Sequence, residues 1–502
     1  VDTVTYPDFS VVDNDYDNNG NVTNVNIPSL QDYGFTFNGT NNVSTESAPS
    51  LEQTQYLYDD DKNLTDIVLP SSAVIHHDYV NNLIGQTTTP EGIINYTYLC
   101  GGKVDTVTEG SETIDYDYDG DLLTGIHYGG LLGEAITQGY NTDFLINSLN
   151  YVGQTTAISY DNDNILTGIH GYTITPHAQH GLPEALNNGT FAQSRLYNGH
   201  GETTSVNTQV ANQDSYDYAL TYNDLGQIIN KQETLHDGTI NNYVYTYHPD
   251  RRWLTTVSKN GSVVESYGYD ANGNRTLHTN TAKGITAVIP SYNLDDQLVS
   301  DGNGASYTYT ADGYLSSKTT SAGITTYQYS SLGRLLSVQP PAPAAVITYQ
   351  HNAMGNRVAK LVGGVITEKY LWLDKTTLLA VYNADNTLKQ RFAYTLGNTP
   401  TSFEQGGNKY YITTDHLGSP RTISDSSGAI IKAIEYDSFG NVLNDSNPSF
   451  SIPFGFASGL YDQDTGLIRF GYRDYDSETG RWTARDPIGL DDGPNIYQYV
   501  QN

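Results

Sequence analysis

The sequence predicts an all-β fold in which a strip of hairpins winds into a curved, hollow β-spiral shell. A motif of tyrosine, three residues and glycine recurs along the chain, as in YDANG at Tyr269 and YDSFG at Tyr436. Three consecutive copies end at Gly313, Gly333 and Gly355, at spacings of 20 and 22 residues. No long stretch places apolar residues at helical spacing between capping residues.

Each copy of the motif is expected to end one strand and form a turn. Residues i and i+2 of a strand share one face, so the Tyr-x-Tyr pairs at 307/309 and 327/329 place two rings on the same side of a sheet. The Asp or Asn that follows can accept hydrogen bonds from backbone amides, and glycine adopts a positive φ freely. YDANGNR, from Tyr269 to Arg275, is therefore predicted to be a strand end and a hairpin turn.

A second glycine-containing turn completes each hairpin, as SAGITT does after the alternating run YLSSKTTS. About twenty residues per hairpin imply on the order of forty strands, whereas open sheets rarely exceed ~10 strands without curling. A chain of 502 residues is also long for one compact core. We therefore expect a sheet that curves as its twist accumulates and buries each repeat against its neighbours.

Two segments interrupt the repeat. QPPAPAA, at residues 339–345, lacks the amide donors of a regular ladder and is expected to be an insertion between repeats. The region from about 165 to 215 fits the repeat poorly, and we expect a longer loop or a short helix there.

The charge balance narrows the possible partners. The chain carries 24 Lys and Arg against 56 Asp and Glu, a net charge of −32, which disfavours binding to nucleic acid or to anionic membrane surfaces. No apolar run approaches the length of a membrane span, and no signal segment opens the chain. The only methionine is Met354, so we expect the sequence to be a piece of a longer product.

No cofactor or metal is expected. The acidic run Asp13–Asn21 resembles a calcium loop, but Gly20 falls two places late, and a solvated turn is the alternative. His177 and His180 have metal-site spacing without a clear third ligand. His416 is expected to hydrogen-bond within a turn. A single cysteine, Cys100, excludes an intrachain disulfide and is compatible with an exported bacterial protein.

From Tyr410 onward the chain carries more specific motifs. They occur in order over roughly 90 residues: DHLGSPR (415–421), YDSFGN (436–441), GLYDQDTGL (459–467), YDSETGRW (475–482), DPIGL (486–490) and NIYQY (495–499). In these motifs the chain strongly resembles the Rhs/YD-repeat family, which includes Rhs polymorphic toxins, the C component of Tc toxin complexes and teneurins. The resemblance implies a YD-repeat β-shell over residues 1–409 and a plug-like Rhs-associated core end over residues 410–502.

The resemblance also implies a site. In toxin members the first D-P-x-G belongs to an aspartic-protease-like centre that cuts after a second D-P-x-G-L, so Asp486 is the catalytic candidate, Arg485 its neighbour and Asp474 a candidate partner. Asp476, Asp491 and Asp492 are also possible partners. An acid pair must lie near enough to share one proton, and closeness in sequence does not show which of these residues does so. The sequence ends before the second motif, where the cut would occur. Enzymatic activity is therefore expected at most as self-cleavage of the full-length chain. A purely structural Asp-Pro turn is the alternative for Asp486.

Two functions follow from this pattern. The first is a structural shell of an exported protein that encloses or scaffolds a C-terminal toxin or effector polypeptide. The second is a cell-surface adhesion or self-assembling module, completed by a companion shell chain or by copies of itself, because open strand edges favour such addition. Both place the protein outside a bacterial cell, secreted or on its surface.

Overall fold

The computed structural model describes residues 3–29 and 31–500, and it confirms the all-β prediction. One long antiparallel sheet runs from β1 (Thr3–Thr5) to β29 (Ile285–Val288), and a second from β30 (Ser291–Tyr292) to β45 (Val442–Asp445). A third, small sheet contains β46 (Leu460–Tyr461), β47 (Leu467–Phe470), β48 (Arg473–Asp476) and β49 (Arg481–Trp482). Within these residues the helices are limited to three short 3-10 turns, η1 (Thr281–Lys283), η2 (Phe456–Ser458) and η3 (Gly489–Asp492).

Successive strands pair with one another, so both long sheets are chains of hairpins. The pairing register shifts immediately before the motif tyrosine in repeat after repeat, including Tyr98 at the end of β10 (Gly92–Tyr98), Tyr269 at the end of β27 (Ser262–Tyr269) and Tyr309 at the end of β32 (Ser306–Tyr309). Such bulges increase the local right-handed twist of a sheet. Their regular placement bends the strip in the same sense at every repeat.

The predicted turn forms as expected at Tyr269. The Asp270 carboxylate accepts the backbone amides of Asn272 and Asn274 at 2.9 and 3.0 Å, and Gly273 has a φ of +83°. The tyrosine also has a role that the sequence did not indicate: its hydroxyl donates to the carbonyl of Leu254 in the preceding hairpin at 2.8 Å. The same bond recurs from the hydroxyls of Tyr79, Tyr98, Tyr118, Tyr160 and Tyr197. The aromatic residue therefore joins each repeat to the one before it.

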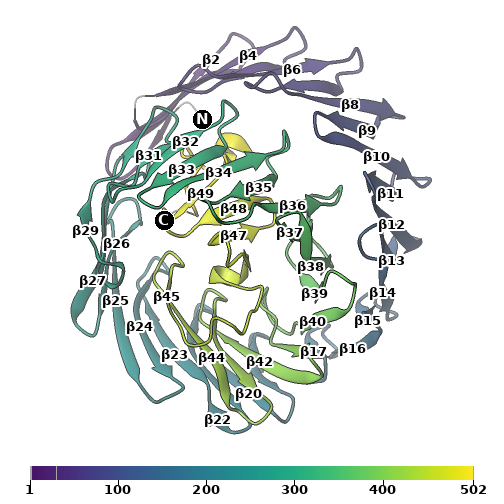
Figure 1. The fold of residues 1–502 in the computed structure, drawn as a ribbon, viewed down its shortest axis with the longest axis vertical. Coiled ribbons are helices and arrows are strands. Elements are labelled where there is room, and N and C mark those ends of the chain that lie inside the picture. The colour runs from purple at the N-terminus through teal and green to yellow at the C-terminus, as the bar shows by residue number, and fades with distance from the viewer. Residues whose placement is uncertain (1–2, 30, 501–502) are drawn as a thin grey trace.

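The first sheet forms an outer ring, and the second sheet lies against it and leads to the small sheet at the centre (Figure 1). Successive revolutions of the spiral, which we call its first and second turns, are joined by hydrogen bonds. Backbone amides of the first turn donate to side chains of the second: Ser29 to Asn272 at 3.2 Å, Ser50 to Asp295 at 2.8 Å and Ser71 to Asp312 at 2.8 Å. We call these three bonds the inter-turn ladder. They span 243, 245 and 241 residues, which is the length of one turn of the spiral.

The second turn is shorter than the first. Arg421 reaches back 188 residues to Glu233, and Asn280 contacts Asp437 only 157 residues further on. Because later contacts between turns span fewer residues, the spiral narrows as it approaches the small sheet. We call residues 450–500, which contain that sheet and end inside the spiral in Figure 1, the plug.

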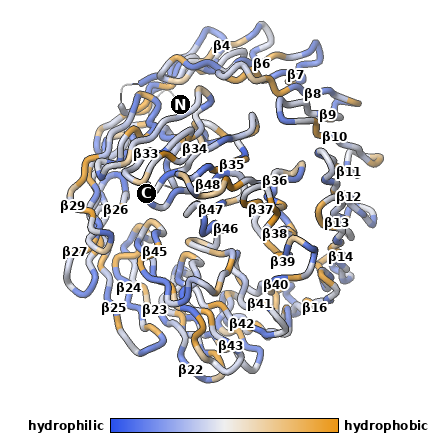
Figure 2. Tube along the Cα trace, viewed as in Figure 1, coloured by the Kyte–Doolittle hydropathy of each residue, from blue (hydrophilic) through white to orange (hydrophobic). Residues whose placement is uncertain are grey.

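The core is a curved layer and not one central mass. One cluster joins Ile114, Ile136 and Tyr151 of the first turn to Leu371 and Tyr382 of the second, and separate clusters line the second turn and the plug. Figure 2 accordingly shows apolar residues recurring along both turns. Each repeat is thus buried against its neighbours, as an extended hairpin architecture requires.

The loop or helix expected between residues 165 and 215 is wrong. That region forms β17 (Leu166–Ile169), β18 (Tyr172–Pro176), β19 (Pro183–Asn187), β20 (Phe191–Tyr197) and β21 (Thr203–Val210). The run YTIT alternates buried Tyr172 and Ile174 with exposed threonines, which is the pattern of a half-buried strand. The proline-rich residues 340–346 lie between β35 (Leu335–Gln339) and β36 (Ile347–His351), as an insertion would. The division at residue 410 stays a prediction, and the second sheet continues beyond it to Asp445.

Candidate functional site

The plug is held by aromatic packing and by bonds to both turns. Tyr475 is fully buried, its ring lies 4.3 Å from that of Tyr499, and its hydroxyl donates to the carbonyl of Phe439 in the wall at 2.8 Å. Leu315 of the wall donates its amide to Thr483 at 2.8 Å, so the wall strand β33 (Leu315–Thr320) begins against the plug. The segment that carries the predicted site is therefore fixed to its surroundings.

Asp486 lies in a closed loop of the plug, whose ends are joined by a bond from its amide to the carbonyl of Ile496 at 2.9 Å. One carboxylate oxygen is 2.7 Å from an Arg473 nitrogen, and the other accepts the amide of Ile488 at 3.1 Å. The second bond is the turn geometry that the structural interpretation of the Asp-Pro sequence expects. The first gives the carboxylate a cationic neighbour.

Two cavities meet at Asp486. One has a volume of 480 Å³ and lies between the first turn, the second turn and the plug, with Tyr56, Tyr314, Arg473 and Arg485 among its walls. The other, of 380 Å³, is bordered by Tyr6 near the start of the described chain and by Val500 near its end. Arg485 lines the first of these, so Asp486 and Arg485 are both accessible from a cavity inside the spiral.

Asp474 is held elsewhere in the plug. Its two carboxylate oxygens contact Arg357 at 3.0 Å and Arg469 at 2.9 Å, and its side chain is 1% exposed. Asp474 and Asp486 share no hydrogen bond, and each is bound to different arginines. Of the other candidate partners, burial raises the pKa of Asp476, and the side chain of Asp492 lies outside the described residues. The catalytic roles of Asp486, Arg485 and Asp474 stay predictions.

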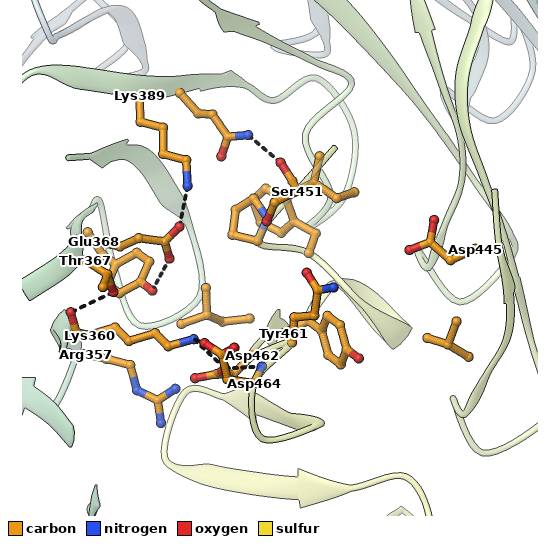
Figure 3. A pocket seen from close by; sticks show the side chains of 18 of the residues that line it. Arg357, Lys360, Thr367, Glu368, Lys389, Asp445, Ser451, Tyr461, Asp462 and Asp464 are labelled. Carbon is orange, nitrogen blue, oxygen red and sulfur yellow. Dashed lines mark hydrogen bonds and ion pairs between the residues drawn. The ribbon is translucent and has the colours of Figure 1, made fainter. Parts of the chain in front are cut away.

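A further cavity of 290 Å³ opens inside the second turn (Figure 3). Its rim consists of ion pairs: Lys389 with Glu368 at 2.6 Å, and Lys360 with Asp462 and Asp464 at 2.6 and 2.5 Å. Its apolar wall includes Ile434, Ile452 and Phe454. The Lys360 pairs connect a wall strand to Asp462 and Asp464 of the plug, whereas the Lys389–Glu368 pair joins two wall strands.

The two histidines with metal-site spacing contact each other and the backbone. His177 and His180 stack with ring centroids 3.8 Å apart, and each Nδ1 atom accepts a backbone amide. No group of three or more His, Cys, Asp or Glu side chains with metal-site geometry occurs among residues 3–29 and 31–500. The turn hydrogen bond expected of His416 is absent at its buried Nδ1, and burial lowers the pKa of this imidazole to about 4. No described helix is long and apolar enough to cross a membrane.

Sequence reasoning missed the arginines that hold these carboxylates. Arg357 lies 117 residues from Asp474, and nothing in the local sequence pairs the two. Arg473 lies in GYRDYD, directly before Asp474, so the sequence did show a cation next to a candidate carboxylate. Its contact with Asp486 depends on the return of the chain after β49.

Comparison with known proteins identifies the family of the chain. The family model described as Teneurin YD-shell matches residues 1–497. Teneurin-3 of Danio rerio is 26% identical over 388 residues, which are 74% of this chain and 14% of that protein. Teneurin-1 of Mus musculus is 28% identical over 310 residues, and the tRNA3(Ser)-specific nuclease WapA of Bacillus spizizenii is 29% identical over 265 residues. The last two matches cover 60% and 52% of this chain and 11% of each relative.

Solved structures share the fold at low identity. The crystal structure of TcdB2-TccC3-TEV matches with a TM-score of 0.79 at 15% identity, over 98% of this chain and 29% of that one. The crystal structure of TcdB2-TccC3 matches with a TM-score of 0.68 at 16% identity, over 98% of this chain and 30% of that one. The chain thus spans less than a third of the length of each of these proteins.

Proposed function

The chain belongs to the teneurin YD-shell family, and from that premise we propose that it forms the wall of a hollow shell that encloses or scaffolds a C-terminal polypeptide. The observation that carries the proposal is the direction of the spiral. The second turn narrows toward a plug, and the described chain ends inside the ring (Figure 1). A polypeptide continuing from there would start within the wall.

The names of the relatives support the same proposal. One solved relative is TcdB2-TccC3 without its hypervariable C-terminal region, and another carries TEV. A third relative, WapA, is a nuclease specific for a tRNA. A wall with an exchangeable C-terminal segment fits these names, and a toxin or effector is the passenger that we propose for this chain.

Protease accessibility tests enclosure. A protease recognition peptide placed after Asn502 should be cleaved at least about tenfold more slowly than the same peptide inserted between Asn260 and Gly261, at an exposed hairpin tip. A scrambled peptide at each position controls for nonspecific cutting. Equal cleavage rates at the two positions would refute enclosure.

Self-cleavage at the core end is a second part of the proposal. Asp486 borders two cavities and contacts Arg473, so a chain segment could reach its carboxylate, with Arg485 at the wall of the same cavity. The test is a chain extended through a second D-P-x-G-L, compared with its Asp486→Asn and Asp474→Asn variants. Processing that survives Asp486→Asn removes the protease assignment, and loss of processing in Asp474→Asn alone would make Asp474 the essential acid.

A surface adhesion or self-assembling module is the alternative. In the second turn, the third residue after the motif tyrosine accepts a hydrogen bond from the first turn, as Asn272, Asp295 and Asp312 do. The equivalent residues of the first turn are exposed: Asn19, Asp61, Asp143 and Asp163. A companion chain or another copy could bond this rim in the same way. A mass that grows with protein concentration favours assembly, whereas a monomer at all concentrations favours the closed shell. Either function places the chain outside a bacterial cell, secreted or at the surface.

A further inference from the structure

Cationic side chains gather around one turn of the second sheet, between β36 and β37 (Arg357–Val362). Arg334 donates to the carbonyl of Ala353 and Arg469 to the carbonyl of Gly355, both at 3.2 Å. A Cβ atom on Gly355 would lie 3.2 Å from the Lys375 ammonium and 3.4 Å from Nε of Arg334. Three positive groups from separate parts of the chain therefore converge on this glycine.

The cluster has fewer carboxylates than cations. Arg334 contacts both oxygens of Glu109, and the Asp474 carboxylate is shared by Arg357 and Arg469. Lys375 has no ion pair or hydrogen bond with any residue that the structure describes, and its nearest aromatic contact is the Tyr472 ring at 4.5 Å. At the Gly355 turn itself, four cations thus face two ion-paired carboxylates, a local excess of two positive charges. The charges that act on Lys375 are those of Arg334 and Arg469.

This arrangement is unfavourable without a counter-ion. Burial, together with the Arg334 and Arg469 guanidinium groups, lowers the pKa of Lys375 to about 8. Burial and the same groups hold the pKa of His351 well below its ordinary value, and both of its buried ring nitrogens lack a hydrogen-bond partner. Like charges in a partly buried site repel strongly unless an anion compensates them.

The cluster faces space in which an anion can bind. Arg334, Gly355, Lys375 and Arg469 all line the 480 Å³ cavity between the turns and the plug. Other parts of its lining carry Arg473, Arg485 and the carboxylates Glu46, Glu52, Asp295, Asp312 and Asp486, none of which is among the charges that act on Lys375. Guanidinium and ammonium groups are the side chains that bind phosphate oxygens, arginine through paired donors and lysine as a point charge. A phosphoryl group carries a charge of about −1.5 to −2 at neutral pH.

We propose that this cluster binds a phosphoryl dianion, either inorganic phosphate or a phosphate monoester, at the Gly355 turn. Its two charges match the excess of two, whereas a single carboxylate would leave one cation uncompensated. The missing side chain at Gly355 leaves the approach between Lys375 and Arg334 open. The site lines the same cavity as Asp486, and its proposed ligand goes beyond the proposed enclosure.

Lys375→Met tests the proposal, because this lysine has no hydrogen bond or ion pair to lose within the described residues. Inorganic phosphate should bind the wild-type protein in a ³¹P NMR titration at fixed ionic strength, and the variant should bind it at least about tenfold more weakly, as expected for loss of a charge-assisted contact. In chloride buffer the variant should unfold at a higher denaturant concentration, because a repelling charge is gone. Lys375→Arg keeps the charge and should keep the binding.

Lys389→Met is the matched control. Lys389 is paired with Glu368 in the other cavity (Figure 3), so this change should leave phosphate affinity unaltered. Tighter binding of phosphoserine than of inorganic phosphate would support a phosphate monoester, and the reverse order would support the free ion. Equal phosphate affinity in the wild type and Lys375→Met, tighter binding of succinate than of phosphate, or a lower unfolding midpoint of Lys375→Met in chloride would each overturn the proposal.

Discussion

The inter-turn ladder predicts that single aspartates fix one turn of the spiral against the next. Asp295 and Asp312 are 9% and 8% exposed, and each accepts one backbone amide across the groove between turns, from Ser50 and Ser71 respectively. Asp295→Ala leaves the Ser50 amide without its acceptor. The serines themselves are exposed, so water can partly replace the lost bond, and we expect a local cost of about 1 kcal/mol at each position.

Hydrogen exchange at individual amides measures this cost directly. A loss of about 1 kcal/mol corresponds to roughly fivefold faster exchange, provided that the amide exchanges through local opening. Asp295→Ala should accelerate exchange at Ser50 and leave Ser71 unchanged, and Asp312→Ala should do the reverse. Because the two aspartates bind different serines, their effects should add in the double variant.

Two controls separate the ladder from general destabilisation. Asp295→Asn keeps an oxygen acceptor, as Asn272 does naturally in the ladder, and should change exchange at Ser50 by less than the alanine variant. Asp143 holds the same motif position in the first turn but is exposed, so Asp143→Ala should have almost no effect. Unchanged exchange at Ser50 in Asp295→Ala would refute the role assigned to the ladder.

Three further perturbations test the wall. Glu233→Gln should reduce the free energy of unfolding by about 3 kcal/mol in denaturant titrations, because Glu233 is fully buried and contacts Arg421 at 2.8 Å. The substitution would leave the Arg421 guanidinium without this counter-charge. A loss below about 1 kcal/mol would contradict this reasoning. Burial raises the pKa of Asp296 from 3.8 to about 6, so the free energy of unfolding should fall as pH rises through that interval. Asp296→Asn should lack this slope, and a pH profile identical to that of the wild type would count against this assignment. Tyr98→Phe removes the hydroxyl bond to Ile84 and should cost about 1 kcal/mol by the same titration, whereas no change would show that the ring alone joins the repeats.

Local chemistry made the repeat predictable. The turn after Tyr269 follows from a carboxylate, two amides and a glycine within five residues, all visible in YDANGNR. The inter-turn ladder was not predicted, because its partners lie about 240 residues apart. A signal was nevertheless present: Ser29, Ser50 and Ser71 each follow a proline and recur every 21 residues, at the turns that meet the second layer.

The candidate site was predictable only in part. Asp486 came from the resemblance of DPIGL to a family motif, while its contact with Arg473 depends on how the plug folds back. The cationic cluster was hidden by composition, since a chain of net charge −32 gives no indication that Arg334, Lys375 and Arg469 meet at one turn. Which residues of two neighbouring turns lie side by side depends on how many residues each turn contains, and no local sequence pattern encodes that number.

The dimensions of the wall limit what it can hold. From Ser29 to Asn272 one turn contains the strands from β4 (Asp32–Phe37) to β27, about two dozen. At ~4.8 Å between strands the circumference is about 115 Å and the diameter about 37 Å, and inward side chains reduce the free width by roughly 10 Å. A folded domain of about 100 residues has a radius of gyration near 13 Å and is wider than the remaining space, part of which the plug occupies. A passenger of that size inside a wall of this curvature would therefore be unfolded, and a folded one would need a wider wall.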